Sequence, residues 1–195
     1  GVDLKSLMRA VIMLGKAGGG STLTQQLAKQ LWSPHANNIF ERALQKPIEW
    51  VIATKLERLY SKEEILTMYL NQFDFLYNAV GIKSAAQVYF STTPADLKQE
   101  EAAMLVGMCK NPALYNPRRR PENALNRRNT VLNQMQKYDY ITEHVCDSLK
   151  ALPIDIKYQS VDHKQGLAPY FREYLRQVLT AKEPKKSNYS EWNQL

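Results

Sequence analysis

Apolar residues recur every three or four positions along almost the whole chain, and this spacing places them on one face of an α-helix. Helical patterns of this kind cover residues 81–90, 94–109 and 122–138. The longest covers residues 39–60, where a buried stripe is expected from Ile48, Val51, Ile52, Leu56 and Leu59. Nearly every patterned segment has the helical period, so the sequence predicts a mainly α fold.

Local signals mark the first two helices. Asp3 suits the N-cap of a first helix, which ends at the glycines of residues 18–20. Ser21 or Thr22 then caps a second helix, and the polar segment 33–38 ends it. This second helix carries an apolar stripe of Leu23, Leu27 and Leu31.

Two further signals concern the long helical segment and its successor. Pro47 lies within the pattern of residues 39–60, so we expect it to kink the helix or to mark its real start. Ser61 and Glu64 fit a capping box, which predicts a new helix directly after that segment.

The last quarter of the chain is less regular. A short helix is expected after Thr142, an extended segment over residues 154–158, and a further helix over residues 168–179. Residues 182–190 have the composition of a linker.

The net charge indicates a class of binding partner but does not identify the partner. The 195 residues carry a formal net charge of +7, which favours polyanions such as nucleic acid, anionic lipid head groups or a pyrophosphate-bearing substrate. Cys109 and Cys146 lie far apart and predict neither a zinc site nor a disulfide framework. No stretch reaches the roughly 18 apolar residues that a membrane-spanning helix requires.

The glycines before Ser21 and Thr22 form a candidate ligand-binding loop. Backbone N–H groups at a helix start suit an anion, and Gly20 lets a ligand approach the chain closely. The helix that follows carries amide, hydroxyl and ammonium groups that hold sugars and phosphates, among them Gln25, Gln26 and Lys29. From the residues alone, a capped flexible loop with a solvated face explains the segment equally well.

Glu49 is the carboxylate that helical spacing singles out. Arg42 and Lys46 share its stripe, so they can pair with Glu49 or gather a pyrophosphate next to it. A solvated ion pair worth a few tenths of a kcal/mol is the simpler interpretation of this spacing.

Five segments together resemble the peptidoglycan glycosyltransferase domain of class A penicillin-binding proteins, over about residues 1–138. The run 19–29 is similar to the family's second conserved segment over its whole length, and Lys46–Glu49 to the third. Residues 60–71 resemble the fourth segment, residues 81–90 continue the pattern, and residues 101–128 resemble the fifth segment.

The chain also departs from the family pattern. Residues 1–3 resemble the end of the first conserved segment, whose glutamate, the general base of the family, is absent here. Gln45 stands in place of an arginine, and residues 73–76 lack the usual Tyr-Phe-Gly. Since the chain begins with Gly1, we expect a truncated fragment that is inactive alone, with its anchor upstream.

The resemblance implies a lysozyme-like helical domain that polymerises lipid II into β-1,4-linked glycan strands and releases polyprenyl pyrophosphate. It implies a catalytic role for Glu49, which would orient the sugar, assist a basic side chain or hold a divalent cation. It assigns substrate binding to Gly20, Ser21, Thr22, Gln25, Gln26, Lys29, Arg42 and Lys46.

The resemblance also implies partners and organisation. It establishes no cofactor and leaves Mg²⁺ or Mn²⁺ open; the expected partners are lipid II, the growing glycan strand, the membrane surface and cell-wall synthesis proteins, with no specific nucleic acid. The expected location is the periplasmic face of the bacterial cytoplasmic membrane. Residues 1–138 would form the glycosyltransferase domain, and residues 139–195 C-terminal helices and a linker toward a transpeptidase domain.

Two alternative functions remain open from the sequence. A lysozyme-like glycan hydrolase would share the fold and use carboxylates in the same way. A non-catalytic module that binds lipid II or membranes would explain the absent first glutamate and the positive charge.

Overall fold

The computed structural model describes residues 21–32 and 38–159, together with Phe171 and Tyr174; of residues 39, 40, 42 and 43 only the backbone is described. The chain divides into two compact units, residues 1–159 and 160–195. The helix and glycine loop predicted before Ser21 and the linker after residue 181 lie outside the described residues. Of the helix predicted over residues 168–179, only Phe171 and Tyr174 are described, and both are helical.

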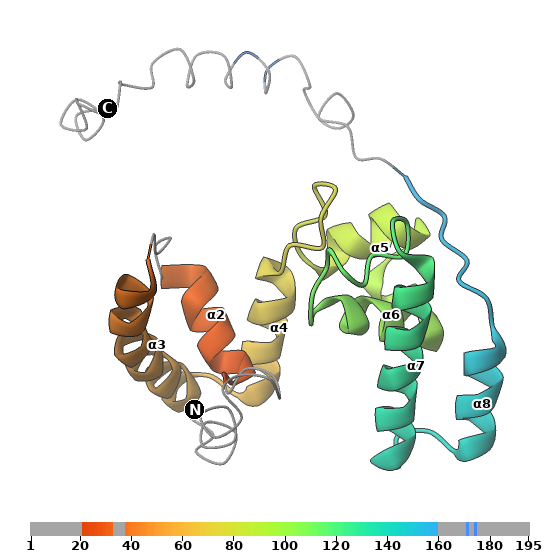
Figure 1. Cartoon of the computed structure of the whole chain (residues 1–195), viewed down its shortest axis with the longest axis horizontal. Coiled ribbons are helices and arrows are strands. Elements are labelled where there is room, and N and C mark those ends of the chain that lie inside the picture. The colour runs from red at the N-terminus through yellow and green to blue at the C-terminus, as the bar shows by residue number, and fades with distance from the viewer. Residues whose placement is uncertain (1–20, 33–37, 160–170, 172–173, 175–195) are drawn as a thin grey trace. The chain divides into compact units, whose positions relative to one another are not determined.

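Seven α-helices and one 3₁₀-helix lie within the described residues, which contain no strand beyond an isolated bridge between Asp74 and Val80 (Figure 1). The predicted mainly α fold is confirmed. The helices are α2 (Leu23–Trp32), α3 (Ile39–Leu59), α4 (Lys62–Gln72), α5 (Ile82–Phe90), η1 (Pro94–Asp96), α6 (Gln99–Met108), α7 (Pro121–Lys137) and α8 (Glu143–Ala151).

Side-chain caps fix the start of α2 and of α4. The Thr22 N–H donates to Gln25 Oε1 at 3.2 Å, and the Gln25 N–H donates to Thr22 Oγ1 at 3.3 Å. Ser61 and Glu64 form the predicted capping box before α4, with distances of 2.8 and 3.2 Å. Each box satisfies N–H groups that have no partner within the helix.

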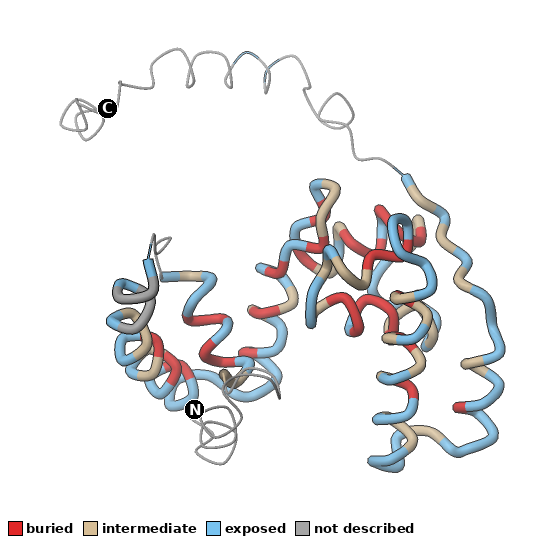
Figure 2. Tube along the Cα trace, in the orientation of Figure 1, coloured by how far each residue is buried: buried red, intermediate tan, exposed pale blue. Residues whose placement is uncertain are grey.

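The predicted buried stripe of α3 is wrong for three of its five residues. Leu56 is buried and Ile52 half-buried, but Ile48, Val51 and Leu59 are 60%, 57% and 75% exposed. The inward face instead carries Glu49, Ala53 and Leu56, and α3 packs against α2 (Figure 2). Tertiary packing therefore selected a face that the apolar pattern alone did not distinguish.

Three smaller expectations also change. Pro47 lies inside α3, which begins at Ile39, so it does not mark the helix start. Leu23 in the predicted stripe of α2 is 39% exposed, whereas Leu27 is fully buried. The helix predicted over residues 94–109 is divided, because Leu97 and Lys98 have extended backbone angles and α6 starts anew after them.

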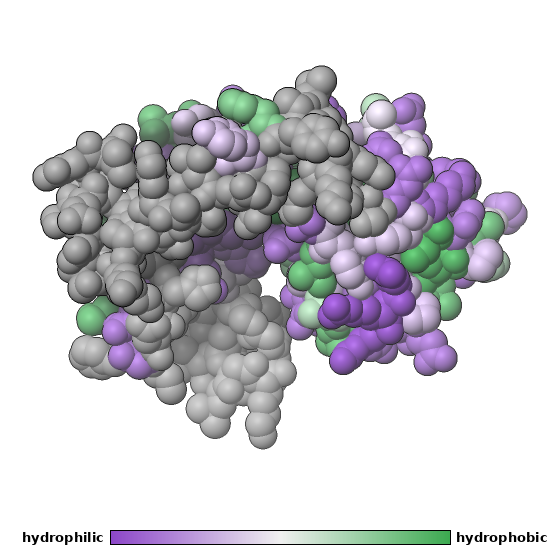
Figure 3. Space-filling model, turned by 90° about the horizontal axis from the view of Figure 1, so that it is seen from above, coloured by the Kyte–Doolittle hydropathy of each residue, from purple (hydrophilic) through white to green (hydrophobic). Residues whose placement is uncertain are grey.

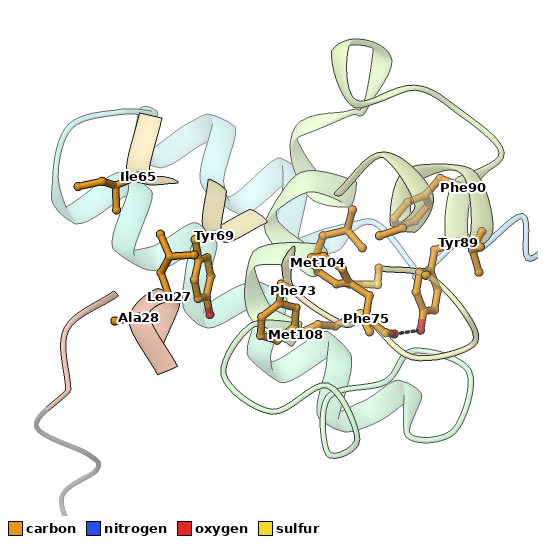
Figure 4. Packing of buried hydrophobic residues seen from close by; sticks show 14 of the residues in the cluster. Leu27, Ala28, Ile65, Tyr69, Phe73, Phe75, Tyr89, Phe90, Met104 and Met108 are labelled. Atoms are coloured by element: carbon orange, nitrogen blue, oxygen red, sulfur yellow. Dashed lines mark hydrogen bonds between the residues drawn. The ribbon is translucent and has the colours of Figure 1, made fainter. Parts of the chain in front are cut away.

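One apolar core connects the helices that surround the site. Leu27 and Ala28 of α2 meet Tyr69 and Phe73 around the end of α4, and the same cluster continues to Met108 of α6 (Figure 4). A smaller cluster joins α6, α7 and α8. The positions of α2 and of the end of α6 therefore depend on one set of packed side chains.

Residues 153–159 carry no helix, as predicted for residues 154–158, and they pair with the end of α5. The Lys157 N–H donates to the Tyr89 carbonyl at 2.9 Å, and the Gln159 N–H donates to the Val88 carbonyl at 2.8 Å. The buried Arg128 guanidinium donates to the carbonyls of Lys150 and Leu152, at 3.1 and 2.7 Å, which completes the end of α8.

The loop between α4 and α5 contains three successive left-handed residues. Leu76, Tyr77 and Asn78 have φ of 68°, 54° and 61°. This conformation costs about 1–2 kcal/mol each for Leu76 and Tyr77, and less for Asn78, whose short polar side chain tolerates it. The Asp74 carboxylate offsets part of this cost by accepting a hydrogen bond from the Leu76 N–H at 2.8 Å.

Gly81 ends this loop, and alanine cannot replace it without strain. Its φ of 83° and ψ of 156° are nearly exclusive to glycine, and an added Cβ would lie 2.7 Å from the Asn71 carbonyl oxygen. We expect Gly81→Ala to lower the free energy of unfolding by about 2–4 kcal/mol, measured by urea denaturation followed by circular dichroism. Gly107→Ala is the matched control, because its φ is not in the left-handed region and its added Cβ would come closest to the Arg127 side chain, at 3.1 Å from Cγ, with the Arg127 backbone at ordinary contact distances of 3.6 and 3.7 Å. Equal losses in the two variants would contradict this account.

Candidate functional site

A cavity of about 470 Å³ gathers polar side chains from three separate segments of the chain. The start of α2 supplies one wall, α3 supplies a second, and the residues that follow α6 supply a third. The lining residues are Ser21, Gln25, Gln26, Lys29, Lys46, Glu49, Cys109 and Lys110.

Lys46 and Glu49 form the central contact of this cavity. The Lys46 ammonium donates to Glu49 Oε2 at 2.9 Å and to Ser21 Oγ at 3.3 Å. The Glu49 side chain is 1% exposed and that of Lys46 is 33% exposed. Of the two arrangements that the spacing allowed, Lys46 pairs with Glu49, and the burial of Glu49 excludes the simpler interpretation as a solvated surface pair. The contact to Ser21 also ties the start of α2 to α3.

The start of α2 presents amides whose orientation is fixed by hydrogen bonds. Gln25 is buried, and its Oε1 belongs to the cap with Thr22. Gln26 Oε1 accepts a hydrogen bond from the Tyr69 hydroxyl at 3.3 Å. This hydrogen bond fixes the amide group, whose NH₂ can donate a hydrogen bond to a ligand. Thr24 further joins α2 to α3, since its hydroxyl donates to Glu57 Oε1 at 2.7 Å.

Six of the nine predicted site residues line the cavity together: Ser21, Gln25, Gln26, Lys29, Lys46 and Glu49. Thr22 does not line it, but caps α2 beside it. Gly20 and the side chain of Arg42 lie outside the described residues.

Sequence reasoning missed Cys109, Lys110 and Tyr69 as neighbours of this site. The sequence indicated only that a helix ends near Asn111, and nothing in its spacing connected that end with residues 21–49. The match of residues 101–128 to a conserved segment was the one available signal.

The charges in the cavity favour an anion. Three ammonium groups and one carboxylate line it, and the carboxylate is already paired with Lys46. The described residues contain no group of three or more acidic, histidine or cysteine side chains with metal-binding geometry. This lining does not fit a divalent cation held by the protein, because the lone carboxylate is surrounded by positive charge.

Burial keeps two groups beside the cavity protonated. It raises the pKa of the Tyr69 hydroxyl to about 12, with a further contribution from Cys109. It likewise raises the pKa of the Cys109 thiol to about 12. Tyr69 therefore remains a hydrogen-bond donor to Gln26 at neutral pH, and Cys109 is a poor nucleophile there.

Residues 1–136 match the family described as transglycosylase. Penicillin-binding protein 1A of Aquifex aeolicus is 39% identical over 181 residues, which cover 90% of this chain and 24% of the relative. Penicillin-binding protein 1F of Bacillus subtilis is 38% identical over 193 residues, which cover 96% of this chain and 26% of the relative.

Two further matches agree with these. Penicillin-binding protein 1A of Escherichia coli is 38% identical over 185 residues, covering 92% of this chain and 21% of the relative. A crystal structure of penicillin-binding protein 1A from Haemophilus influenzae matches with a TM-score of 0.50 at 23% identity, covering 85% of this chain and 20% of that one. The structural likeness shows the fold alone. The chain spans about a quarter of the length of the curated relatives it matches.

The raised pKa values of Tyr69 and Cys109 predict an alkaline loss of stability. Above about pH 9 the unfolded chain releases these protons before the folded chain does, so the free energy of unfolding falls as the pH approaches 12. We expect the melting temperature of Tyr69→Phe/Cys109→Ser to fall less between pH 8 and pH 10.5 than that of the unsubstituted protein. Tyr89, whose pKa burial also raises, remains in both proteins.

Tyr140→Phe is the control for this measurement, since Tyr140 is 79% exposed. It should leave the alkaline loss unchanged. An unaltered loss in the Tyr69→Phe/Cys109→Ser variant would show that neither group contributes.

Proposed function

The chain belongs to the transglycosylase family, and we propose that it acts in a peptidoglycan glycosyltransferase that polymerises lipid II into β-1,4-linked glycan strands. The observation that supports this most is the cavity, where an anion-binding set of ammonium groups surrounds a buried, paired carboxylate. The departing group of this reaction is polyprenyl pyrophosphate, an anion of the kind that such a lining accommodates.

The transfer makes one bond and breaks another. The oxygen of the acceptor's 4-hydroxyl bonds to the anomeric carbon of the donor, and the bond from that carbon to the pyrophosphate oxygen breaks. The pyrophosphate leaves with the electron pair, and the hydroxyl proton passes to a general base. We assign no base among the described residues.

We propose that Lys29 and Lys46 stabilise the negative charge that develops on the pyrophosphate. Ser21 and Gln26 would position the donor, Ser21 by its contact with Lys46 and Gln26 by its amide NH₂. Thr22 and Gln25 would act by holding the start of α2 in place. Gly20 and Arg42 stay predicted substrate contacts.

Of the roles open to Glu49, fixing the ammonium of Lys46 has the best structural support. A carboxylate that is 1% exposed and 2.9 Å from an ammonium holds it in one place within the cavity. A fixed charge stabilises a transition state without reorganising during the reaction.

We expect Glu49→Gln to reduce polymerisation by about 100-fold or more, because Lys46 loses its charged partner while the shape of the site is kept. The measurement uses the complete gene product and labelled lipid II, with glycan strands separated on gels. Glu63→Gln is the control, since Glu63 is an exposed carboxylate at the start of α4. Glu49→Gln activity within threefold of the unsubstituted protein would contradict the assignment.

The same assay distinguishes the alternatives, which the family match does not favour. Growth of glycan strands supports a transferase, cleavage of preformed strands indicates a hydrolase, and lipid II binding without turnover indicates a binding module.

We further propose that the protein works at the membrane surface, on the periplasmic side of the bacterial cytoplasmic membrane. Lipid II is membrane-bound, so its polymerase must reach the bilayer. No helix among the described residues is long and apolar enough to cross a membrane. The relatives are named penicillin-binding proteins, and we propose that residues 139–195 lead from a domain of residues 1–138 toward a domain of that kind.

The outer face of α3 is the described surface best suited to touch lipid. Leu44, Ile48 and Val51 fall on one side of the helix and are 57–60% exposed, and Leu59 continues that side. Among the residues coloured on the face seen in Figure 3, hydrophobic and hydrophilic residues are mixed. An apolar face on a surface helix is stabilised by insertion into the lipid interface.

We expect the triple variant Leu44→Ser/Ile48→Ser/Val51→Ser to bind less to phosphatidylglycerol vesicles, by about tenfold or more, because it removes apolar area from one contiguous face. Vesicle sedimentation measures the effect on the chain of residues 1–195. The control removes three scattered exposed residues instead: Leu66, Val80 and Leu152. Equal binding of both triple variants would reject α3 as the contact.

A further inference from the structure

We propose that Arg118 and Arg119 form a docking site for an acidic segment of a partner protein, whose carboxylates bind to guanidinium groups held against tyrosine rings. We call this surface the arginine patch; it consists of the two arginines with Tyr77 and Tyr158. None of these residues lines the cavity described above, so the patch is a second site, and its role goes beyond the proposed glycosyl transfer.

Two aromatic rings hold the exposed guanidinium group of Arg118. Its Cζ lies 4.3 Å from the ring centroid of Tyr158 and 5.2 Å from that of Tyr77. The two ring centroids are 5.6 Å apart, and the rings meet at 76°. The Arg119 Cζ lies 5.5 Å from the Tyr77 centroid. A guanidinium group that packs against a ring can still donate hydrogen bonds from its edge to a further partner.

A buried asparagine fixes the turn that presents both arginines. Asn116 is fully buried, and its Oδ1 accepts hydrogen bonds from the N–H groups of Arg118 and Arg119, at 3.0 and 3.2 Å. Its Nδ2 donates to the Tyr89 hydroxyl at 3.0 Å, and that hydroxyl donates to the Phe75 carbonyl at 2.7 Å. The turn is therefore attached to the core, so little backbone freedom is lost when a partner binds.

The third part of the patch comes from the segment that follows α8. This segment runs to the end of α5, where the Lys157 N–H donates to the Tyr89 carbonyl (Figure 1). The Tyr158 ring then lies 6.5 Å from the Tyr89 ring and 5.6 Å from the Tyr77 ring, measured between centroids. Three loops that are distant in sequence thus meet around Arg118.

The positive charges of this patch are not compensated within the described part of the chain. Arg118, Arg119 and Arg120 are consecutive and exposed, and none of them forms an ion pair with a described residue. Arg118 and Arg119 both lie near the ring of Tyr77, so their charges repel each other. An anion bound to both guanidinium groups would relieve this repulsion.

The hydrogen bonds of the turn favour a carboxylate over a phosphate. The N–H groups of Arg118 and Arg119 are bonded to Asn116 Oδ1, and the Arg120 N–H donates to the Asn116 carbonyl at 2.8 Å. These backbone groups therefore do not form the N–H cradle that commonly binds phosphate. The planar edge of a guanidinium group matches a planar carboxylate, to which it donates two parallel hydrogen bonds.

Two other occupants fit the patch less well than an acidic protein segment. The chain continues beyond Tyr158 into residues 160–195, but these contain more basic than acidic residues and do not complement the arginines. The apolar face that we propose to touch lipid belongs to α3, which does not pack against α6, α7 or α8, the helices nearest to the arginines and Tyr158. The patch is therefore not part of that lipid-facing surface.

The test measures the binding of fluorescently labelled hexaglutamate to the complete gene product by fluorescence anisotropy. Arg118→Gln/Arg119→Gln should weaken this binding by about tenfold, because the charge-assisted hydrogen bonds of both guanidinium groups are lost. Arg58→Gln/Lys62→Gln is the matched control, since it removes two exposed positive charges from the end of α3 and the start of α4. It should weaken binding by no more than about twofold.

Arg118→Lys/Arg119→Lys separates the geometry of the guanidinium group from its charge. This variant keeps both positive charges, but an ammonium group cannot donate the two parallel hydrogen bonds, so we expect binding to weaken by about threefold or more. The melting temperatures of all variants should stay close to that of the unsubstituted protein, because the substituted side chains are exposed. Unchanged hexaglutamate binding in the lysine variant would overturn recognition by guanidinium groups.

Three further probes identify the class of anion. Labelled hexaglutamine should bind at least tenfold more weakly than hexaglutamate, and sodium triphosphate should displace hexaglutamate less effectively than the unlabelled peptide does. Phosphatidylglycerol vesicles should bind equally to Arg118→Gln/Arg119→Gln and to the control variant. The inference is overturned if these two variants bind hexaglutamate equally, if triphosphate is the better competitor, or if only vesicle binding is lost.

Discussion

The ion pair between Glu49 and Lys46 sets the orientation on which the rest of the site depends. A carboxylate that is 1% exposed is costly unless a cation lies against it, and Lys46 does so at 2.9 Å. With Glu49 turned inward beside Ala53 and Leu56, the helical period turns Ile48 and Val51 outward. The buried pair and the exposed apolar face of α3 are therefore two consequences of one helix rotation.

Local sequence signals predicted the helices well and their faces poorly. The capping box of Ser61 and Glu64 involves residues three positions apart, so the sequence contained all of its determinants. The inward face of α3 was not predictable in this way, because apolar residues occur on both sides of the helix. Packing against α2 and burial of the Glu49–Lys46 pair decide between the sides, and both are properties of the folded chain.

The candidate site likewise contains residues that the sequence could place and residues that it could not. Ser21, Gln26 and Glu49 come from neighbouring helices of a recognisable pattern, and the structure brings them to one cavity. Cys109 and Lys110 could not be placed from spacing, because their position depends on the core that runs from α2 through Phe73 to Met108. A contact that forms only through an apolar core cannot be predicted from a local sequence pattern.

The walls of the cavity are held in place by different contacts. The start of α2 is tied to α3 through Ser21 and Lys46, whereas Lys110 is positioned by α6 and its core contacts. An anion that touches ammonium groups of both parts would connect them directly and relieve the repulsion between the positive charges that line the cavity. A ligand that binds only the assembled cavity stabilises the folded state in proportion to its affinity. Binding of the donor and the mutual positioning of these helices are therefore coupled through the same charges.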